Sequence, residues 1–205
     1  MDNTVSIRVF DKVVAASLRP VLWKNGGGVT REIAQGGAPG QPFDWRVSVA
    51  EVDQPGPFST FERIDRVLVM TRGEQMVLKN GNDVHELACW QPFAFAGEAP
   101  ITAHLPSGPT RDFNLMVRRA FGRGQVHVHQ RAEPLAVNAG IALFHCAAGA
   151  FTIAAQGQDS TTVTLEEGDT LHVQVDARTL FDVRPVVADS TLIDARIEPF
   201  GASRH

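Results

Sequence analysis

The sequence of 205 residues has few cysteines, no surplus of positive charge and no long apolar run. Its two cysteines, Cys89 and Cys146, match no zinc or redox spacing, which favours buried thiols in a reducing compartment over a disulfide. With 19 Lys and Arg against 23 Asp and Glu, the chain lacks the basic surplus that neutralises phosphates. It also lacks a membrane span or signal-peptide pattern. We therefore expect a cytoplasmic protein that binds neither nucleic acid nor membrane.

Long amphipathic helical patterns are also missing, and short β-rich segments take their place. Runs of Val, Ile, Phe, Thr and Leu recur between clusters of Gly, Pro, Asn and Asp, several of them with period-two alternation. The best helical candidate, Asp11–Leu18, is short and carries β-branched residues. Hydrophobic residues make up 43% of the chain, which is enough for a core. The pattern predicts an all-β sandwich, barrel or jelly roll.

An internal similarity indicates two copies of one unit. Residues 66–97 align with 142–173 at a constant offset, although a chance match stays open at this low identity. The string LEEGDTLHV, Leu165–Val173, resembles the second half of a cupin barrel, and ELACWQPFAF, Glu86–Phe95, resembles a degenerate copy of it. This resemblance implies a bicupin, a pair of stacked cupin-like jelly rolls. We assign them to residues 1–122 and 123–205 and allow for strands exchanged between them.

Seven histidines raise the question of a metal site. His127 and His129 form an H-x-H whose side chains share one strand face, but Glu133 follows inside a Glu-Pro break. Neither repeat carries the inward His pair and carboxylate that a metal-binding cupin needs. No nucleophile elbow or phosphate-binding loop occurs either. We expect no metal, no cofactor and no assigned catalytic residue, with the H-x-H pair as the alternative metal site.

The most unusual segment is WKNGGGVTREIA, Trp23–Ala34. Its three consecutive glycines permit close approach of the backbone to a ligand or to another strand. An aromatic ring, a cation, an amide and a hydroxyl surround them, and Thr30 and Glu32 share a face of the strand that follows. This pattern favours a ligand-lining loop. The alternative is a tight loop whose polar residues satisfy its own backbone.

Two later strands add polar faces. Arg46 and Ser48 share a face of FDWRVSVAEV, and Asp112 and Asn114 share a face of RDFNLMVRR. If these faces converge with that of Glu32, Arg46 is the group to hold a carboxylate through two parallel bonds. The alternative is that Arg46 pairs structurally with Glu32 or Asp112. The candidate ligand-binding residues are Trp23, Lys24, Asn25, Gly26, Gly27, Thr30, Glu32, Arg46, Ser48, Asp112 and Asn114.

Taken in order, these motifs resemble the HutD/Ves family: W-K-N-G-G-G-x-T-R-E-I, F-x-W-R-x-S-x-A-x-V, G-P-F-S-x-F, D-R and D-F-N-L-M-x-R-R. The resemblance implies a bicupin fold. For the HutD branch, the resemblance implies a regulator of histidine utilisation that binds a small molecule and senses N-formylglutamate. For the Ves branch, it implies a stress-induced protein. One position departs from the family pattern F-x-G-x-D-R, because Arg63 stands where members carry Gly.

Three functions compete at this stage. The first is a metal-free binding protein for a small anionic metabolite, for which Arg46 and Lys24 supply cations and Trp23 an apolar wall. The second is a metal-independent isomerase or hydrolase with Glu32 or Asp112 as general base. The third is an interaction role with the glycine loop as an oligomer contact. A homodimer is compatible with the sequence.

Overall fold

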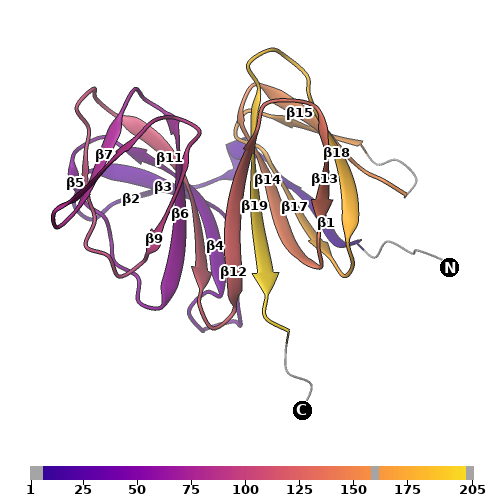
Figure 1. Cartoon of the computed structure of the whole chain (residues 1–205), viewed down its shortest axis with the longest axis horizontal. Helices are drawn as coiled ribbons and strands as arrows, with labels where there is room; N and C mark the ends of the chain where they lie inside the picture. Colours follow the sequence, from indigo (N-terminus) through magenta and orange to yellow (C-terminus); the bar gives the residue numbers. More distant parts are fainter. Residues whose placement is uncertain (1–6, 158–161, 202–205) are drawn as a thin grey trace. The chain divides into compact units, whose positions relative to one another are not determined.

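The computed structural model describes residues 7–157 and 162–201, which form β-strands for the most part. In this part of the chain the helical structure is a single 3-10 turn, η1 (Ala15–Ser17), so the all-β prediction is confirmed. No helix among these residues is long and apolar enough to cross a membrane. Contacts divide the chain into an N-terminal unit, 18–124, and a C-terminal unit, 1–17 with 125–205 (Figure 1).

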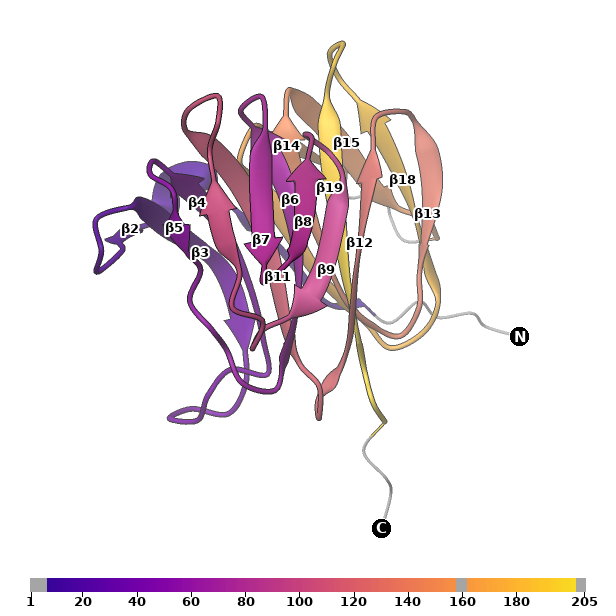
Figure 2. The same cartoon turned by 60° about the vertical axis from the view of Figure 1, so that its left-hand side comes forward.

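The N-terminal unit consists of two antiparallel sheets that enclose one core. The larger sheet has the order β2-β3-β4-β11-β6-β9 and the smaller β5-β10-β7-β8. Leu68 and Met70 of the larger sheet pack with Met76 and Leu78 of the smaller sheet. Strands β7 and β8 of the smaller sheet lie towards the viewer in Figure 2. The strands are β2 (Pro20–Leu22), β3 (Gly28–Gly36), β4 (Trp45–Val52), β5 (Gly56–Pro57), β6 (Ile64–Arg72), β7 (Met76–Asn80), β8 (Asp83–Leu87), β9 (Pro92–Ala96), β10 (Thr102–His104) and β11 (Thr110–Arg118).

The C-terminal unit has the same construction. Its sheets have the orders β1-β17-β14-β19-β12 and β13-β18-β15-β16. Phe144, Phe151 and Phe181 are fully buried in its core, and the rings of Phe144 and Phe181 lie 5.4 Å apart. The strands are β1 (Ile7–Val13), β12 (Gly122–His129), β13 (Glu133–Val137), β14 (Gly140–Ala148), β15 (Ala150–Ala155), β16 (Thr162–Glu166), β17 (Thr170–Val175), β18 (Thr179–Pro185) and β19 (Thr191–Pro199).

The two units repeat one topology. The order β4-β11-β6-β9 corresponds to β12-β19-β14-β17, and β5-β10-β7-β8 corresponds to β13-β18-β15-β16. Residues 67–69 of β6 align with 143–145 of β14, so the sequence alignment pairs equivalent strands. The register makes Asn114 equivalent to Asp194, because Asn114 lies opposite Leu68 and Asp194 opposite Phe144. Each unit thus carries a polar side chain at the same place in its central strand.

The first strand joins the other half of the chain. β1 pairs antiparallel with β17, from Ile7 opposite Val175 to Val13 opposite Thr170. The predicted division at 122/123 assigned this segment to the N-terminal domain, whereas its contacts place it in the C-terminal unit. The predicted division did allow for strands exchanged between the halves. The segment 11–18 forms the end of β1 and the turn η1 rather than a helix.

Candidate functional site

Polar side chains of three neighbouring strands share the inner face of the larger sheet of the N-terminal unit. Asn114 on β11 lies opposite Ser48 on β4, and Ser48 lies opposite Glu32 on β3. Because every second residue of a strand faces the same side, Asp112 and Arg46 belong to this face as well. The three predicted polar faces therefore do converge, and Ser48, Asp112 and Asn114 are buried.

Arg46 is engaged with Glu32. Its Nε donates a hydrogen bond of 2.8 Å to Oε2 of Glu32. The two side chains are 21% and 39% exposed, so solvent reaches this part of the polar face. The contact is the structural pairing that the sequence left open as an alternative. A ligand at Arg46 would have to share its guanidinium with Glu32.

The most buried cation of this face is Arg66, which the sequence analysis did not select. Arg66 on β6 is 6% exposed. Its Nη2 donates to Oδ1 of Asn114 at 2.9 Å and its Nη1 to the carbonyl of Ser59 at 3.2 Å, while its buried Nε has no hydrogen-bond partner in the described part of the chain. The guanidinium lies 4.8 to 5.6 Å from the centroids of three aromatic rings, those of Phe58, Phe61 and Phe95.

The sequence did contain a signal for Arg66. Strand β6 alternates, and Arg66 shares its face with Leu68 and Met70, both of which are fully buried in the core. A cation at a core position of a strand is uncommon unless a partner satisfies it. The arginine of the D-R pair was therefore a candidate by pattern alone.

An amide connects the buried cation to a buried carboxyl. Nδ2 of Asn114 donates to Oδ1 of Asp112, while Oδ1 of Asn114 accepts from Arg66. Burial raises the pKa of Asp112 to about 7, against the opposing effects of the Arg66 charge and the Asn114 hydrogen bond. Burial lowers the pKa of Arg66 to about 10, opposed by Asp112 and reinforced by the charge of Arg46. The cluster therefore holds a carboxyl that can exchange a proton near neutral pH.

The glycine loop uses much of its polarity on itself. The indole Nε1 of Trp23 donates to Oγ1 of Thr30 at 2.8 Å, and Oδ1 of Asn25 accepts from the backbone N–H of Gly27 at 3.0 Å. The carbonyl of Gly27 accepts from the next loop, from the N–H of Asp53 at 2.9 Å. These contacts support the self-satisfied loop that the sequence left open.

The last glycine of the loop is needed for close packing. A Cβ on Gly28 would lie 2.3 Å from the carbonyl oxygen of Glu51, so the two strands approach too closely for a side chain. Gly26 adopts a φ of 70°, which favours glycine. Lys24 is exposed on the loop. Both glycines thus have structural reasons for being there.

The loop that precedes Arg66 contains Arg63, the residue at which this chain departs from the family pattern. Arg63 has a φ of 59°, a left-handed conformation in which glycine is unstrained. Its backbone N–H donates to Oε1 of Glu98 at 2.5 Å, and Glu98 also accepts from Arg119. Arg119 lowers the pKa of Glu98 to about 2. An ion pair therefore fixes the loop between Phe61 and Arg66 where the family pattern has glycine.

The histidine pair lies in the C-terminal unit. Among the described residues no group of three or more His, Cys, Asp or Glu side chains is arranged to hold a metal ion. His127 is exposed, whereas Nδ1 of His129 lies 2.8 Å from Oε1 of Glu133 and its Nε2 lies 3.5 Å from Oδ2 of Asp194. Glu133 begins β13, so its expected place in a break between strands was wrong. His129 acts as a bridge between two carboxylates.

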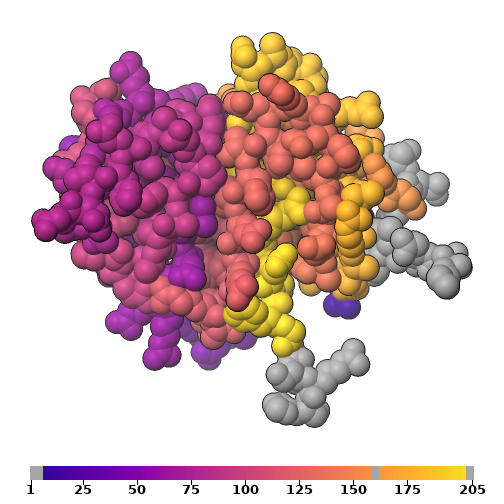
Figure 3. Space-filling view, in the orientation of Figure 1, coloured from indigo at the N-terminus to yellow at the C-terminus, as the bar shows by residue number. Residues whose placement is uncertain are grey.

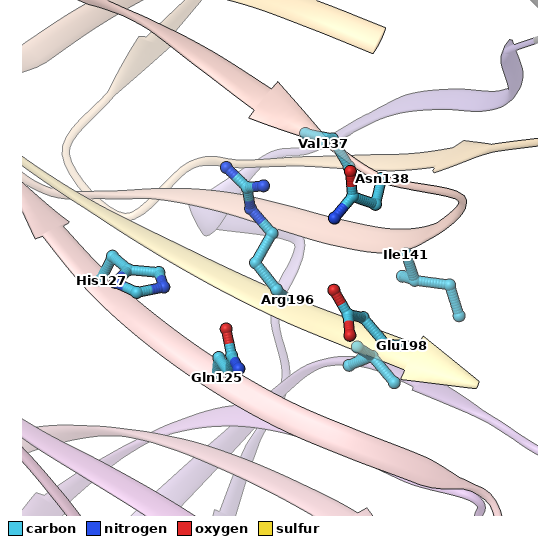
Figure 4. A pocket seen from close by; sticks show the side chains of 8 residues that line it. Gln125, His127, Val137, Asn138, Ile141, Arg196 and Glu198 are labelled. Atoms are coloured by element: carbon cyan, nitrogen blue, oxygen red, sulfur yellow. The ribbon is translucent and has the colours of Figure 1, made fainter. Parts of the chain in front are cut away.

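A pocket of about 100 Å³ lies beside this bridge (Figure 4). Its best placed cation, Arg196, already binds both oxygens of the buried Asp194 at 2.7 and 2.5 Å, and also the carbonyl of Ala136. Atoms of β12 and of the end of β19 are visible at the surface in the space-filling view (Figure 3). An anion would have to compete with Asp194, so this pocket is a poor anion site. It is lined by Gln125, His127, Val137, Asn138, Ile141, Arg196, Ile197 and Glu198.

The two thiols are unsuited to nucleophilic chemistry. Both cysteines are free, with Cys146 buried and Cys89 half-buried. Burial raises the pKa of Cys146 to about 12 and also raises that of Cys89. Neither thiol is therefore a thiolate at neutral pH. This agrees with the prediction from the sequence that the two cysteines are thiols rather than a disulfide.

Comparison with known proteins identifies relatives of this chain. The HutD family model matches residues 15–188. Protein Ves of Cronobacter sakazakii is 43% identical over 112 residues, which cover 54% of this chain and 61% of that protein. An uncharacterised 21.2 kDa protein from the hutC 3' region of Pseudomonas putida is 40% identical over 96 residues, which cover 46% of this chain and 50% of the relative. The matches thus span half to three fifths of these curated relatives.

Solved structures show the same fold over most of the chain. A conserved protein of unknown function from Pseudomonas aeruginosa PAO1 has a TM-score of 0.85 at 26% identity and covers 92% of this chain and 98% of its own. HutD from Pseudomonas fluorescens SBW25 has a TM-score of 0.81 at 27% identity and covers 94% and 100%. An oxalate decarboxylase from Lactobacillus farciminis, with a TM-score of 0.62 at 9% identity over 91% and 85%, shows only the shared cupin-like β fold.

Proposed function

This chain belongs to the HutD family, and we propose that it is a cytoplasmic, metal-free receptor for a small organic anion held on the polar face of the N-terminal unit. The metabolite expected from the family resemblance is N-formylglutamate, whose binding would regulate histidine utilisation. The relative from the hutC region of Pseudomonas putida supports this context. The alternative setting for the same binding site is the stress-induced role that the family resemblance implies for the Ves branch.

The observation that carries the proposal is the state of Arg66. A buried guanidinium is costly unless it is hydrogen-bonded and paired, yet its Nε has no hydrogen-bond partner in the described part of the chain. Its neighbours are an amide oxygen, a carbonyl oxygen and three aromatic rings. A ligand carboxylate at Nε would supply the missing acceptor in a site of low dielectric, where charged hydrogen bonds are strong.

A second cation is placed for the other end of a dianion. Met116 on β11 lies opposite Arg46 on one side and opposite Arg66 on the other. Adjacent strands are spaced by 4.7–4.9 Å, so the two arginine backbones stand about 10 Å apart on one face. That separation suits a short dicarboxylate whose ends meet the two guanidinium groups. N-formylglutamate has a carboxylate at each end of a short carbon chain and a neutral formamide group on its α-carbon.

Calorimetry on matched arginine variants tests the site. Arg66→Lys should weaken binding of N-formylglutamate by about 1–3 kcal/mol, roughly 5- to 150-fold, because lysine cannot reproduce the planar fork. The control is Arg111→Lys: Arg111 lies on the same strand as Asn114 but on the opposite face, where it pairs with Glu51 at 3.0 Å. Equal affinities for Arg66→Lys and the wild type would remove Arg66 from the site. No binding by the wild type would remove N-formylglutamate as the ligand.

Arg46 provides a second variant that is easier to fold, because it is partly exposed. Arg46→Lys should weaken binding over the same range if Arg46 holds a carboxylate. If Arg46 serves only its ion pair with Glu32, the variant should melt at a lower temperature and bind with unchanged affinity after correction for the folded fraction. The melting curve and the titration together separate the two roles.

One observation favours turnover as a second candidate function. Asp112 is fully buried and its pKa is raised to about 7, which suits a general base or acid near neutral pH. Incubation of N-formylglutamate and related pathway intermediates with the protein, followed by liquid chromatography that separates isomers and by mass spectrometry, tests for isomerase or hydrolase activity. Turnover that Asp112→Asn abolishes would establish an enzyme, and unchanged ligand would leave the receptor as the proposed function.

A further inference from the structure

A buried carboxyl lies beneath the proposed anion site without a cation bound directly to it. Asp112 is 1% exposed, and in the described part of the chain its hydrogen-bond partner is the amide of Asn114. The same amide accepts from Arg66. The orientation of Asn114 is therefore fixed, with its nitrogen towards the carboxyl and its oxygen towards the guanidinium.

The charges around Asp112 are few and balanced. The strands beside it contribute Arg66 from β6, Arg46 from β4 and Glu32 from β3. The smaller sheet faces it with apolar core residues that include Met76 and Leu78. With Asp112 ionised, this face holds two positive and two negative charges. A bound carboxylate would leave it with an excess of negative charge in a poorly hydrated site.

We propose that Asp112 takes up a proton when an anion binds at Arg66, which makes the proton part of the recognition. This inference rests on the proposed receptor function and concerns the regulation of that same site. Its consequence is a receptor that binds its anion more tightly at lower pH. Affinity falls as pH rises above neutrality, because the carboxyl must then be protonated at increasing cost.

We assign the proton to Asp112 because Asp112 is buried, whereas Glu32 is partly exposed. Glu32 is 39% exposed and keeps an ion pair with Arg46. Asp112 is buried with Asn114 as its hydrogen-bond partner in the described part of the chain, and burial has already raised its pKa to about 7. The protonated carboxyl also keeps one oxygen free to accept from Asn114. Proton uptake at Asp112 therefore breaks no contact seen in the structure.

Titration calorimetry in buffers of different ionisation enthalpy measures the protons taken up per ligand bound. With N-formylglutamate as probe, the wild type should take up about half a proton at about pH 7 and up to about 0.9 at about pH 8. Its affinity should fall up to about fivefold between those values. Asp112→Asn should bind with no uptake and little change with pH. The matched control, Asp83→Asn, removes an exposed carboxylate at the start of β8 and should behave as the wild type.

The outcomes separate the two proposals. Binding with uptake that only Asp112→Asn abolishes supports proton-coupled recognition. Binding without proton uptake, or with the same uptake in Asp112→Asn, overturns the coupling and leaves the receptor intact. No binding by the wild type or by Asp112→Asn at either pH overturns the receptor site and the coupling that rests on it.

Discussion

Replacement of Asp112 by Asn tests the electrostatics of the N-terminal core without any ligand. Burial raises the pKa of Asp112 from 3.8 to about 7. Asparagine has nearly the same shape, and its Oδ1 can accept the hydrogen bond that Asn114 donates. The substitution therefore removes the ionisation and keeps the packing.

The effect on stability has a defined sign. The folded pKa of Asp112 lies above its unfolded value, so the folded state binds more protons and loses stability as pH rises from about 4 to about 7. A shift of about 3 units corresponds to a loss of at most about 4 kcal/mol in the free energy of unfolding. The wild type and Asp112→Asn should be of similar stability at about pH 4. At about pH 8 the variant should be the more stable protein, by up to that amount.

Tryptophan fluorescence during urea unfolding is a suitable assay. The three tryptophans, Trp23, Trp45 and Trp90, all belong to the N-terminal unit, so the signal reports on the part of the chain that contains Asp112. The difference between variant and wild type cancels the titration of other groups. Asp83→Asn is the control with an exposed carboxylate. A difference that stays constant from acid to alkaline pH would refute a raised pKa at Asp112.

Three further predictions follow from packing and charge. Gly28→Ala should destabilise the protein by about 1–3 kcal/mol in thermal unfolding, because the new Cβ would lie 2.3 Å from the carbonyl oxygen of Glu51. Asp194→Asn should cost about 3–5 kcal/mol in chemical unfolding followed by circular dichroism, because it leaves Arg196 without its buried counter-ion. Burial of the ring lowers the pKa of His129, but its contacts with two neighbouring carboxylates outweigh this effect and raise the pKa. The stabilising effect of the protonated ring should therefore be lost as pH rises through that pKa. His129→Gln should lack this pH dependence, and an NMR titration of the ring gives the pKa directly.

Strand character and side-chain faces were accessible from the sequence because they are local properties. A strand places alternate residues on opposite sides whatever its neighbours are. The pairs Arg46 with Ser48 and Asp112 with Asn114 could therefore be assigned to common faces before the neighbours of each strand were known. The internal similarity of residues 66–97 to 142–173 was visible for the same reason, since turns and strands recur there at similar spacing, whereas the strand order came from the structure.

Arg66 shows where local reasoning ended. Its importance depends on Phe95 and Asn114, which reach its guanidinium from strands distant in the sequence. Whether an arginine on an alternating strand faces solvent or a core is decided by the sheet that covers it. The raised pKa of Asp112 has the same origin, because desolvation is a property of the packed unit.

The all-β class, the internal similarity and the polar residues of three strands could be read from the sequence, since composition and period-two alternation act residue by residue. Only the tertiary structure decided that β1 joins the C-terminal unit, that Asn25 and Trp23 satisfy their own loop, and that Arg46 pairs with Glu32. The contacts of Asn25 and Trp23 are local, and the sequence left them open because the same loop could equally have faced a ligand. The pairing of β1 with β17 and of Arg46 with Glu32 depends on which strands become neighbours, so no local pattern specifies it.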